Sequence, residues 1–326
     1  MSTDAKPSLS VILITADSYA SIRKTVSYLR QQTIQAEVEL VIVAASKASL
    51  ALGPAADELA GFSSYQVVEI GPIVSIGRAY AAGVRAAKAA VVALGEDHCF
   101  PEPGWAAALV AAHQQPHAAV GPALRNANAN SAISWADMLI AYVQWMDPAV
   151  GQLVNFLPGH NSSYKREILL SYDSLDEMME SETLLHWDLR SRGHTLYLEP
   201  QAKAAHTNFA QLFPWLPVQF RAGRIFAGGR AEVEHWSWLK RLLYTAASPL
   251  IPAVRMARIL RELNRGERRQ VKLAMGTLPM TLLGLAADGL GQMVGYGFGY
   301  GDTLQDYAEA EFHRERYLAN SKPANG

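Results

Sequence analysis

Two long apolar runs near the start of the chain, separated by an amphipathic segment, restrict the fold more than any other feature. Leu9 to Thr15 (LSVILIT) and Val38 to Ser46 (VELVIVAAS) are continuous apolar stretches rich in β-branched residues. Between them, Ile22, Val26 and Leu29 recur at helical spacing. Strands that are apolar throughout suit a parallel sheet covered by helices on both faces. The chain is therefore predicted to begin with a strand, a helix and a second strand.

The same alternation continues along the chain. A strand is expected in YQVVEI (65–70), followed by a helix over Ile76 to Ala90 and a strand in VVALG that ends at Gly95. Alternating strands and helices are typical of the α/β class, and the ligands of such sheets bind beyond the carboxyl ends of the strands. We therefore predict a central, mostly parallel sheet flanked by helices, with a nucleotide-sized ligand at that edge.

The composition excludes several classes of protein. Of 326 residues, 50% are hydrophobic and 18% are charged, which excludes a disordered chain. The formal net charge of −1 provides no global attraction for nucleic acid, and no nucleic-acid partner is expected. The single cysteine excludes an internal disulfide framework, and the first residues lack the shape of a secretory signal. We expect a cytoplasmic protein, or one peripheral on the cytoplasmic face of the inner membrane.

A charged tripeptide follows the predicted strand VVAL at the edge where ligands bind. Glu96, Asp97 and His98 come directly after this strand and its closing glycine. Neighbouring carboxylates repel one another unless a cation lies between them, and oxygen ligands suit Mg²⁺ or Mn²⁺ bound together with a diphosphate. The alternative is a solvated acidic loop, which is common after strands.

Two further segments place polar residues next to predicted elements. Phe156 to Leu169 (FLPGHNSSYKREIL) is a glycine loop that leads into a helix. Glu180 to Pro200 begins with acidic residues, continues as a helix that stops at Gly193, and re-emerges as a strand. A further short strand, QAKAAHTNF, is expected to carry His206.

Taken in order, these segments resemble the family 2 glycosyltransferases, which have the GT-A fold. The resemblance covers roughly Ser8 to Phe209. SVILITADSYASIRKTVSYLRQQT resembles the family's opening strand and helix, and LGEDHCFPEPGW resembles its Asp-x-Asp metal segment with the following Pro-Gly-Trp turn. SETLLHWDLRSRGHTLYLEP resembles the helix that starts with an acidic pair and ends in Arg-x-x-Gly. Each motif alone is weak, but their order and spacing together are fairly specific.

The resemblance implies a nucleotide-sugar donor. Thr15 and Asp17 occupy the positions of a nucleotide contact, and Arg78 is placed to contact the diphosphate. The family's second strand commonly ends in paired aspartates, one of which contacts the nucleotide base, whereas this chain has Ala44 and Ala45. The choice among UDP, GDP and dTDP sugars therefore stays open.

The resemblance also implies a divalent cation. It places Glu96, Asp97 and His98 on the metal-binding tripeptide, and His98 stands where the family usually has an aspartate. Asp97, His98 and His206 are the expected metal ligands, with Glu96 also facing the donor. Imidazole is a better ligand for Mn²⁺ than for Mg²⁺, which favours Mn²⁺. For His206, the alternative is a hydrogen-bonded core histidine.

The catalytic base is expected in the acidic pair, because alignment from Gly193 puts Glu182 on the catalytic acid of the family. Glu182 would take the acceptor hydroxyl's proton in an inverting transfer, with Glu180 as the reserve choice. The alternative is an acidic first turn that merely favours the helix dipole. The acceptor side is expected at Gly159, His160 and Asn161, and the acceptor is a glycan or a lipid-linked glycan.

The C-terminal third combines basic and apolar segments. Gln219 to Lys272 contains twelve Lys and Arg against four Asp and Glu, and Arg255 to Arg265 predicts an amphipathic basic helix. Two uncharged stretches follow, separated by Asp288, and neither reaches the roughly 20 residues of a spanning helix. These features favour attachment to an anionic membrane surface. The alternatives are a helix packed on the catalytic domain or a contact between copies in a homo-oligomer.

The predicted organisation is a GT-A catalytic domain over 1–215, a helical region over 216–317 with membrane association, and a disordered tail over 318–326. The Gln-x-x-Arg-Trp segment of processive synthases is missing, so addition of a single sugar is favoured over polymerisation. Two other hypotheses stay open at this point. One is a non-catalytic scaffold with the same fold, and the other is a nucleotidyltransferase.

Overall fold

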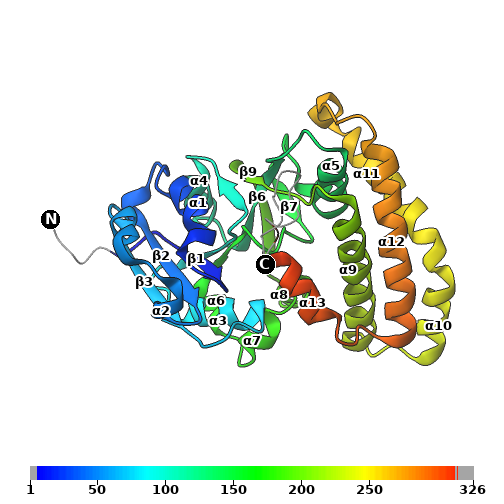
Figure 1. Ribbon diagram of the computed structural model, residues 1–326, viewed down its shortest axis with the longest axis horizontal. Helices are drawn as coiled ribbons and strands as arrows, with labels where there is room; N and C mark the ends of the chain where they lie inside the picture. Colours follow the sequence, from blue (N-terminus) through cyan, green and yellow to red (C-terminus); the bar gives the residue numbers. More distant parts are fainter. Residues whose placement is uncertain (1–5, 313, 315–326) are drawn as a thin grey trace, which may run out of the picture. The chain divides into compact units, whose positions relative to one another are not determined.

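The computed structural model describes residues 6–312 and residue 314, and divides the chain into two compact units (Figure 1). The first unit comprises Met1–Arg125 and Trp145–His206, and the second comprises Asn126–Gln144 and Thr207–Gly326. The segment Asn126–Gln144 thus joins the second unit although it lies inside the predicted catalytic domain. The predicted boundary at residue 215 stays a prediction, and the predicted tail over 318–326 lies outside the described residues.

The first unit contains one nine-stranded sheet and its covering helices. The strands are β1 Leu9–Thr15, β2 Val38–Ala44, β3 Ser64–Glu69, β4 Val91–Gly95, β5 Cys99–Pro101, β6 His117–Asn126, β7 Gln152–Val154, β8 Ser163–Lys165 and β9 Thr195–His206. The helices are α1 Tyr19–Leu29, α2 Lys47–Leu50, α3 Ile76–Ala86, α4 Trp105–Ala112, α6 Arg166–Leu170, α7 Leu175–Met178 and α8 Glu182–Ser191. The predicted opening strand, helix and strand are confirmed.

The sheet has a parallel half and an antiparallel half. Its order is β3-β2-β1-β4-β8-β6-β9-β5, with β7 paired to β9. β1 pairs in parallel with β2 and β4, whereas β8 lies antiparallel between β4 and β6. The expectation of a mostly parallel sheet was therefore wrong for the second half. Parallel pairs need long crossover connections, and the short strands β5, β7 and β8 are joined to the sheet without them.

The strand β9 is longer than the sequence indicated. Two separate strands were expected, over residues 195–200 and 201–209, but a single strand of 12 residues spans Thr195–His206. The first part of β9 pairs with β7, where Leu198 faces Gln152, and its end pairs with β5, where His206 faces Cys99. Because each half has its own antiparallel partner, the strand continues past Pro200. This pairing decides where His206 lies.

The second unit is helical. Its elements are α5 Ala132–Tyr142, α9 Leu212–Val233, α10 Trp238–Ala247, η4 Ser248–Leu250, α11 Ile251–Leu263, α12 Thr277–Phe298 and α13 Thr303–Phe312. Helix α12 lies beside α9 on one side and α10 on the other (Figure 1). Glycines make the α9 contact close, because a Cβ at Gly291 would lie 2.0 Å from the carbonyl oxygen of Phe220. The two helices therefore pack backbone against backbone.

Helix α12 runs through the charge that was expected to separate two apolar stretches. Asp288 is buried within this 22-residue helix, and Arg255 of α11 binds its carboxylate at 2.6 Å. Gln292, one turn later, donates a second hydrogen bond to Asp288 at 2.8 Å. The charge is compensated from a distant part of the chain, so it does not end the helix. Among the described residues, no helix is both long and apolar enough to cross a membrane.

Candidate functional site

The site begins at the carboxyl end of β4, where the predicted charged tripeptide is held by the backbone. The Thr25 hydroxyl on α1 donates to the carbonyl oxygens of Glu96 and Asp97 at 2.9 and 3.0 Å. Glu96 is 8% exposed, so a carboxylate is buried directly at the strand end. The solvated acidic loop considered as an alternative therefore does not describe Glu96.

The pairing of β9 with β5 brings His206 to this strand end. Cys99 of β5 lies opposite His206, so the preceding residue, His98, becomes its neighbour. The two imidazole rings lie edge to face with their centroids 5.0 Å apart, and His206 is fully buried. Two residues separated by more than a hundred positions are thus placed together by one strand register.

Glu96, His98 and His206 form a cluster that fits a metal ion. Each offers one ligand atom, and these atoms all lie within 4.8 Å of one another. The buried Nε2 of His98 has no hydrogen-bond partner among the described residues, so it is available as a ligand. Two imidazoles and a carboxylate suit a first-row divalent ion such as Mn²⁺.

The cluster differs in one residue from the expected ligand set. Asp97, expected as a ligand, binds Nδ1 of His98 at 2.6 Å instead, and Glu96 takes its place in the cluster. A carboxylate on one imidazole nitrogen fixes the ring and directs the lone pair of the other nitrogen toward a metal. In this metal-free arrangement the carboxylate of Asp97 holds the ring of His98, and the direct ligation by Asp97 that the sequence indicated stays a prediction.

The charges around Glu96 favour its ionised form. Burial alone would raise the pKa of Glu96, but His98, His160 and His206 together hold it well below its usual value. Asn161 also donates to its second carboxylate oxygen at 2.8 Å. A buried carboxylate surrounded in this way remains an anion that is ready to bind a cation.

His160 connects this cluster to Glu182. Its Nδ1 lies 2.6 Å from Glu96 and its Nε2 lies 2.8 Å from Glu182, so one imidazole bridges two carboxylates. Burial would lower the pKa of His160, but Glu182 and Glu96 raise it well above its usual value. In turn, burial would raise the pKa of Glu182, yet His160 lowers it. The predicted base is thus an anion in contact with an imidazolium.

The loop before β8 has the backbone that this bridge needs. Glu182 opens α8, and a Cβ at Gly159 would lie 2.0 Å from its side chain, so any larger residue there would displace the Glu182 carboxylate. Asn161 has φ 68°, a left-handed conformation that asparagine tolerates. The backbone N–H of Asn161 donates to the Leu94 carbonyl of β4 at 2.6 Å. The three residues assigned to the acceptor side therefore lie between Glu96 and Glu182.

The other predicted donor contacts lie at the end of β1 and on α3. The Thr15 hydroxyl is buried and interacts with Ser18 and Ser21 at the start of α1, and Asp17 is exposed just beyond it. Arg78 is exposed on α3. Glu180, the reserve base, accepts a hydrogen bond from the Ser75 hydroxyl. Their roles stay predictions.

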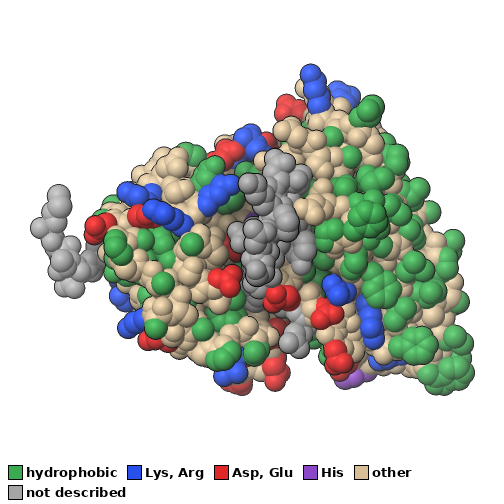
Figure 2. Space-filling view, viewed as in Figure 1, with side chains coloured by type: hydrophobic (Ala, Val, Ile, Leu, Met, Phe, Trp, Pro, Cys, Tyr) green, Lys and Arg blue, Asp and Glu red, His purple; other side chains and the backbone are tan. Residues whose placement is uncertain are grey.

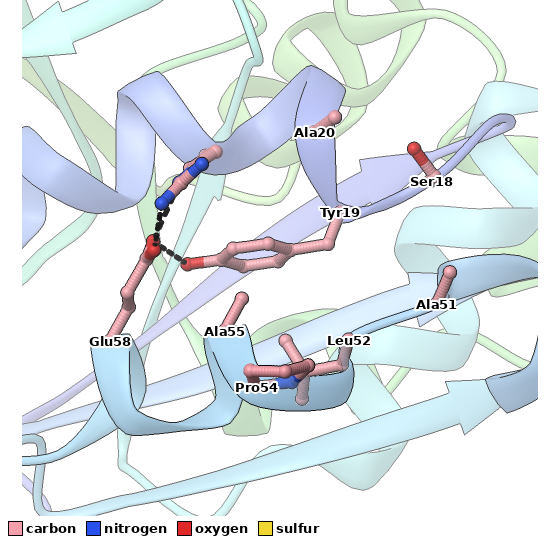
Figure 3. A pocket seen from close by; sticks show the side chains of 9 residues that line it. Ser18, Tyr19, Ala20, Ala51, Leu52, Pro54, Ala55 and Glu58 are labelled. Atoms are coloured by element: carbon pink, nitrogen blue, oxygen red, sulfur yellow. Dashed lines mark hydrogen bonds and ion pairs between the residues drawn. The ribbon is translucent and has the colours of Figure 1, made fainter.

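A cavity of about 440 Å³ opens at the start of α1, between this helix and the turn η2 Gly53–Leu59 (Figure 3). Its wall includes Tyr19 and Glu58, which share a hydrogen bond of 3.1 Å, and Arg23 binds the same carboxylate. The remaining lining is mostly small and apolar. Tyr19, Arg23 and Glu58 of the wall are therefore already bound to one another.

Sequence reasoning did not find the bridging role of His160 or the support from Thr25. His160 was placed on the acceptor side from its position in the glycine loop, and nothing in its neighbours indicated two carboxylate partners. Thr25 lies on the apolar face of α1, where a threonine is an ordinary residue. The one available signal was a hydroxyl on a face that is expected to be buried, because a buried hydroxyl needs a hydrogen-bond partner.

Comparisons with known proteins identify the family and the fold. The family model described as Glycosyl transferase family 2 matches residues 10–172. The mannosyltransferase PcManGT from Pyrobaculum calidifontis, solved with GDP-Man and Mn²⁺, has a TM-score of 0.51 and 13% identity over 98% of this chain and 78% of that chain. At this identity the likeness concerns the fold alone. No curated protein sequence matches the chain significantly.

Two further solved structures are similar at a lower level. GalNAc-T7 with UDP, GalNAc and Mn²⁺ has a TM-score of 0.46 and 15% identity, covering 63% of this chain and 44% of that chain. TarS 1-349 from S. aureus has a TM-score of 0.42 and 13% identity, covering 68% and 64%. This chain thus spans less than half of the GalNAc-T7 chain and somewhat less than two thirds of the TarS fragment.

Proposed function

The chain belongs to glycosyl transferase family 2 and has the GT-A fold, and from this premise we propose that it transfers a sugar from a nucleotide-sugar donor to an acceptor hydroxyl with the help of a divalent cation. The family and the fold are those that the sequence predicted. The donor, the cation and the acceptor belong to the proposal.

One observation carries this proposal. The cluster of Glu96, His98 and His206 could bind a metal ion, and the imidazole of His160 connects it to the carboxylate of Glu182. Glu96, His98 and His206 would hold the cation, and His98 supports this because its buried Nε2 has no other described partner. A divalent cation bound there would supply positive charge to the departing diphosphate. The Mn²⁺ in the solved PcManGT structure supports the choice of ion.

Glu182 is the proposed base. Its side chain is 34% exposed, so an acceptor hydroxyl is able to reach it, and its lowered pKa keeps it ionised at neutral pH. His160 holds one oxygen, Oε1, at 2.8 Å, and the carboxylate would accept the proton of the acceptor hydroxyl. Direct attack by that hydroxyl on the donor's anomeric carbon would invert its configuration. For the acceptor we keep the class expected from the sequence, a hydroxyl of a glycan or of a lipid-linked glycan.

The donor is proposed to bind along the carboxyl ends of β1 and β4, where Thr15, Asp17 and the cluster follow from neighbouring strands. PcManGT was solved with GDP-Man, which supports a nucleoside diphosphate sugar as donor class. Ala44 and Ala45 at the end of β2 provide no carboxylate that could contact the nucleotide's base, so recognition of the nucleotide would rest on other groups.

Thermal stabilisation by a panel of nucleoside diphosphates, with and without Mn²⁺, tests the proposal. A ligand that binds only the folded protein raises its melting temperature. We expect one nucleotide to stabilise the wild-type protein when Mn²⁺ is present, and His206→Ala to lose this effect. His194→Ala, outside the cluster, is the matched control. Stabilisation that is independent of Mn²⁺, or that survives in His206→Ala, would contradict the assigned cation site.

A further inference from the structure

Exposed apolar side chains are concentrated in the helical unit. Among the described residues, 22 large hydrophobic side chains are exposed, and 17 of them belong to the second unit against five in the first. Figure 2 shows hydrophobic side chains gathered over the helices of this unit. An extended exposed apolar surface on a folded protein usually marks an interaction site.

Helix α10 is the centre of this surface. None of its ten residues is buried, although it contains one tryptophan and three leucines. The exposed fractions are 70% for Trp238, 60% for Leu239, 58% for Leu242 and 65% for Leu243. A helix that packs on a core turns such residues inward. Here the apolar side chains point to the outside instead.

The apolar stripe continues through η4 into α11. Leu250 and Val254 are 66% and 48% exposed, and they follow Leu243 at intervals of seven and four residues. These intervals keep the three side chains on one side of a helical path. We refer to the exposed residues 238–254 together with Arg258 and Arg261 as the outer face of α10 and α11.

Cations take over where the apolar stripe ends. Arg258 and Arg261 are exposed at the next positions of the same face, and Arg269 and Lys272 are exposed after it. No described acidic side chain pairs with any of these four. Arg255, by contrast, points inward to Asp288. The predicted face of Arg255, Arg258 and Arg261 is thus divided, and two of its three cations remain available to an anionic partner.

We propose that the outer face of α10 and α11 binds the surface of an anionic lipid bilayer. The leucines and Trp238 would enter the boundary between headgroups and acyl chains, and the arginines would contact the lipid phosphates. Charge complementarity selects this occupant, since unpaired cations beside an apolar stripe match an anionic surface. A two-fold contact with a second copy would bring the same cations toward each other. The inference does not depend on sugar transfer.

Flotation of the full chain with vesicles tests this proposal. We expect the wild-type protein to float with vesicles containing phosphatidylglycerol and to stay behind with pure phosphatidylcholine. At about 1 M salt, where charges are screened beyond roughly 3 Å, the difference between the two lipids should largely disappear. Light scattering of the lipid-free protein at the same concentrations detects a second copy on this face.

Two double variants separate the two parts of the surface. Leu242→Gln with Leu243→Gln keeps helix-forming side chains and is expected to weaken binding about a hundredfold. Arg258→Gln with Arg261→Gln is expected to weaken it about 30-fold, and only for anionic vesicles. Two controls lie in the first unit. Val150→Gln is the control for the leucine variant, and the double variant Lys6→Gln with Arg30→Gln is the control for the arginine variant. Both should bind like the wild type.

Three results would overturn the proposal. One is a wild-type protein that floats with neither kind of vesicle, and another is binding of both double variants as tight as that of the controls. A dimer that forms without lipid and dissociates in Leu242→Gln with Leu243→Gln would assign the face to a second copy. Near-ultraviolet circular dichroism of each variant excludes unfolding as the cause of lost binding.

Discussion

The two units of the chain depart from the usual distribution of side chains in opposite directions. The first unit buries a cluster of polar side chains at the end of a strand, where Glu96 is 8% exposed and the neighbouring His206 is fully buried. The second unit exposes apolar surface, with Trp238 at 70% and Leu243 at 65%. Both arrangements cost folding free energy, because charged groups favour water and apolar groups avoid it. Such local departures are expected where a protein binds something else.

Buried charge alone does not identify a site, as a second comparison shows. In the second unit, Asp288 is also buried, but Arg255 and Gln292 satisfy its carboxylate. In the first unit, the buried Nε2 of His98 has no hydrogen-bond partner among the described residues, and it lies 3.5 Å from the carboxylate of Glu96, beside a second imidazole. The Arg255–Asp288 pair in the second unit connects two helices, whereas the cluster in the first unit contains a nitrogen that could bind a metal ion.

The largest effect is expected for the base. Glu182→Gln keeps the size of the side chain but removes its ability to accept a proton, so kcat should fall by roughly 10²–10⁴. Binding of Mn²⁺ and nucleotide should be retained, because Glu182 is outside the ligand cluster. The comparison variant is Glu180→Gln, the reserve base, which should keep most of the activity. Steady-state kinetics measure both, and a larger loss in Glu180→Gln would reverse the assignment.

The buried pair of the second unit should act on stability alone. Arg255→Met leaves Asp288 without its cation and is expected to lower the free energy of unfolding by about 3 kcal/mol. Arg255→Met combined with Asp288→Leu removes both charges and should recover most of that loss. Denaturant unfolding of the three variants measures the effect, and nucleotide binding at the first unit should not change. Equal losses in the single and double variants would show that the pair is not the cause.

Acidification should distinguish the two units without any mutation. Burial lowers the pKa of His113 and His186 to about 4, so the unfolded chain binds protons first as pH falls from 6.5. Each histidine should then remove about 3 kcal/mol of stability from the first unit between pH 6.5 and 4. In the second unit, burial raises the pKa of Asp137. The folded protein therefore binds this proton before the unfolded chain does, so acidification adds stability here instead of removing it.

The bridging groups do not disturb this comparison in the metal-free protein. The raised pKa of His160 means that its stabilising charge is fully present below pH 6.5 and is lost only as pH rises. The lowered pKa values of Glu96 and Glu182 mean that their contribution is lost only below about pH 4.5. Hydrogen exchange, corrected for the intrinsic rate, reports each unit separately. Acid loss confined to the second unit would refute this prediction.

The smallest effect concerns the orientation of a metal ligand. Asp97→Asn removes the carboxylate from Nδ1 of His98 but keeps a hydrogen-bonding group of the same size. The affinity for Mn²⁺ should fall by about 10–100-fold. Isothermal titration with Mn²⁺ measures it, and Asp17→Asn, an exposed acid after β1, is the control. A complete loss of binding would instead make Asp97 a direct ligand, as the sequence suggested.

Local sequence patterns predicted the elements but not their long-range partners. The continuous apolar runs at β1 and β2 and the helical spacing of α1 were sufficient because burial on both faces imposes those patterns. The fate of Asp288 was not predictable in this way, since its partner Arg255 lies 33 positions earlier and on another helix. The length of β9 likewise depends on pairing with β5 and β7, which no local pattern specifies.

The site was predicted in composition rather than in geometry. Glu96, Asp97, His98 and His206 were selected, but periodicity cannot tell which of two adjacent acids turns inward after a strand ends. The hydrogen bonds from Thr25 to this segment and the pairing of His206 with Cys99 decide that question. The bridge through His160 was missed for a similar reason, because it joins three segments that are distant in the sequence.

Pulsed electron paramagnetic resonance of bound Mn²⁺ tests the central claim most directly, since it detects nitrogen nuclei that are coordinated to the ion. The account predicts coupling to two imidazole nitrogens in the wild-type protein with a nucleoside diphosphate, one nitrogen in His206→Ala or His98→Ala, and two weakly held nitrogens in Asp97→Asn. Bound Mn²⁺ without nitrogen coupling, or unchanged coupling in both histidine variants, would contradict a cation held by Glu96, His98 and His206.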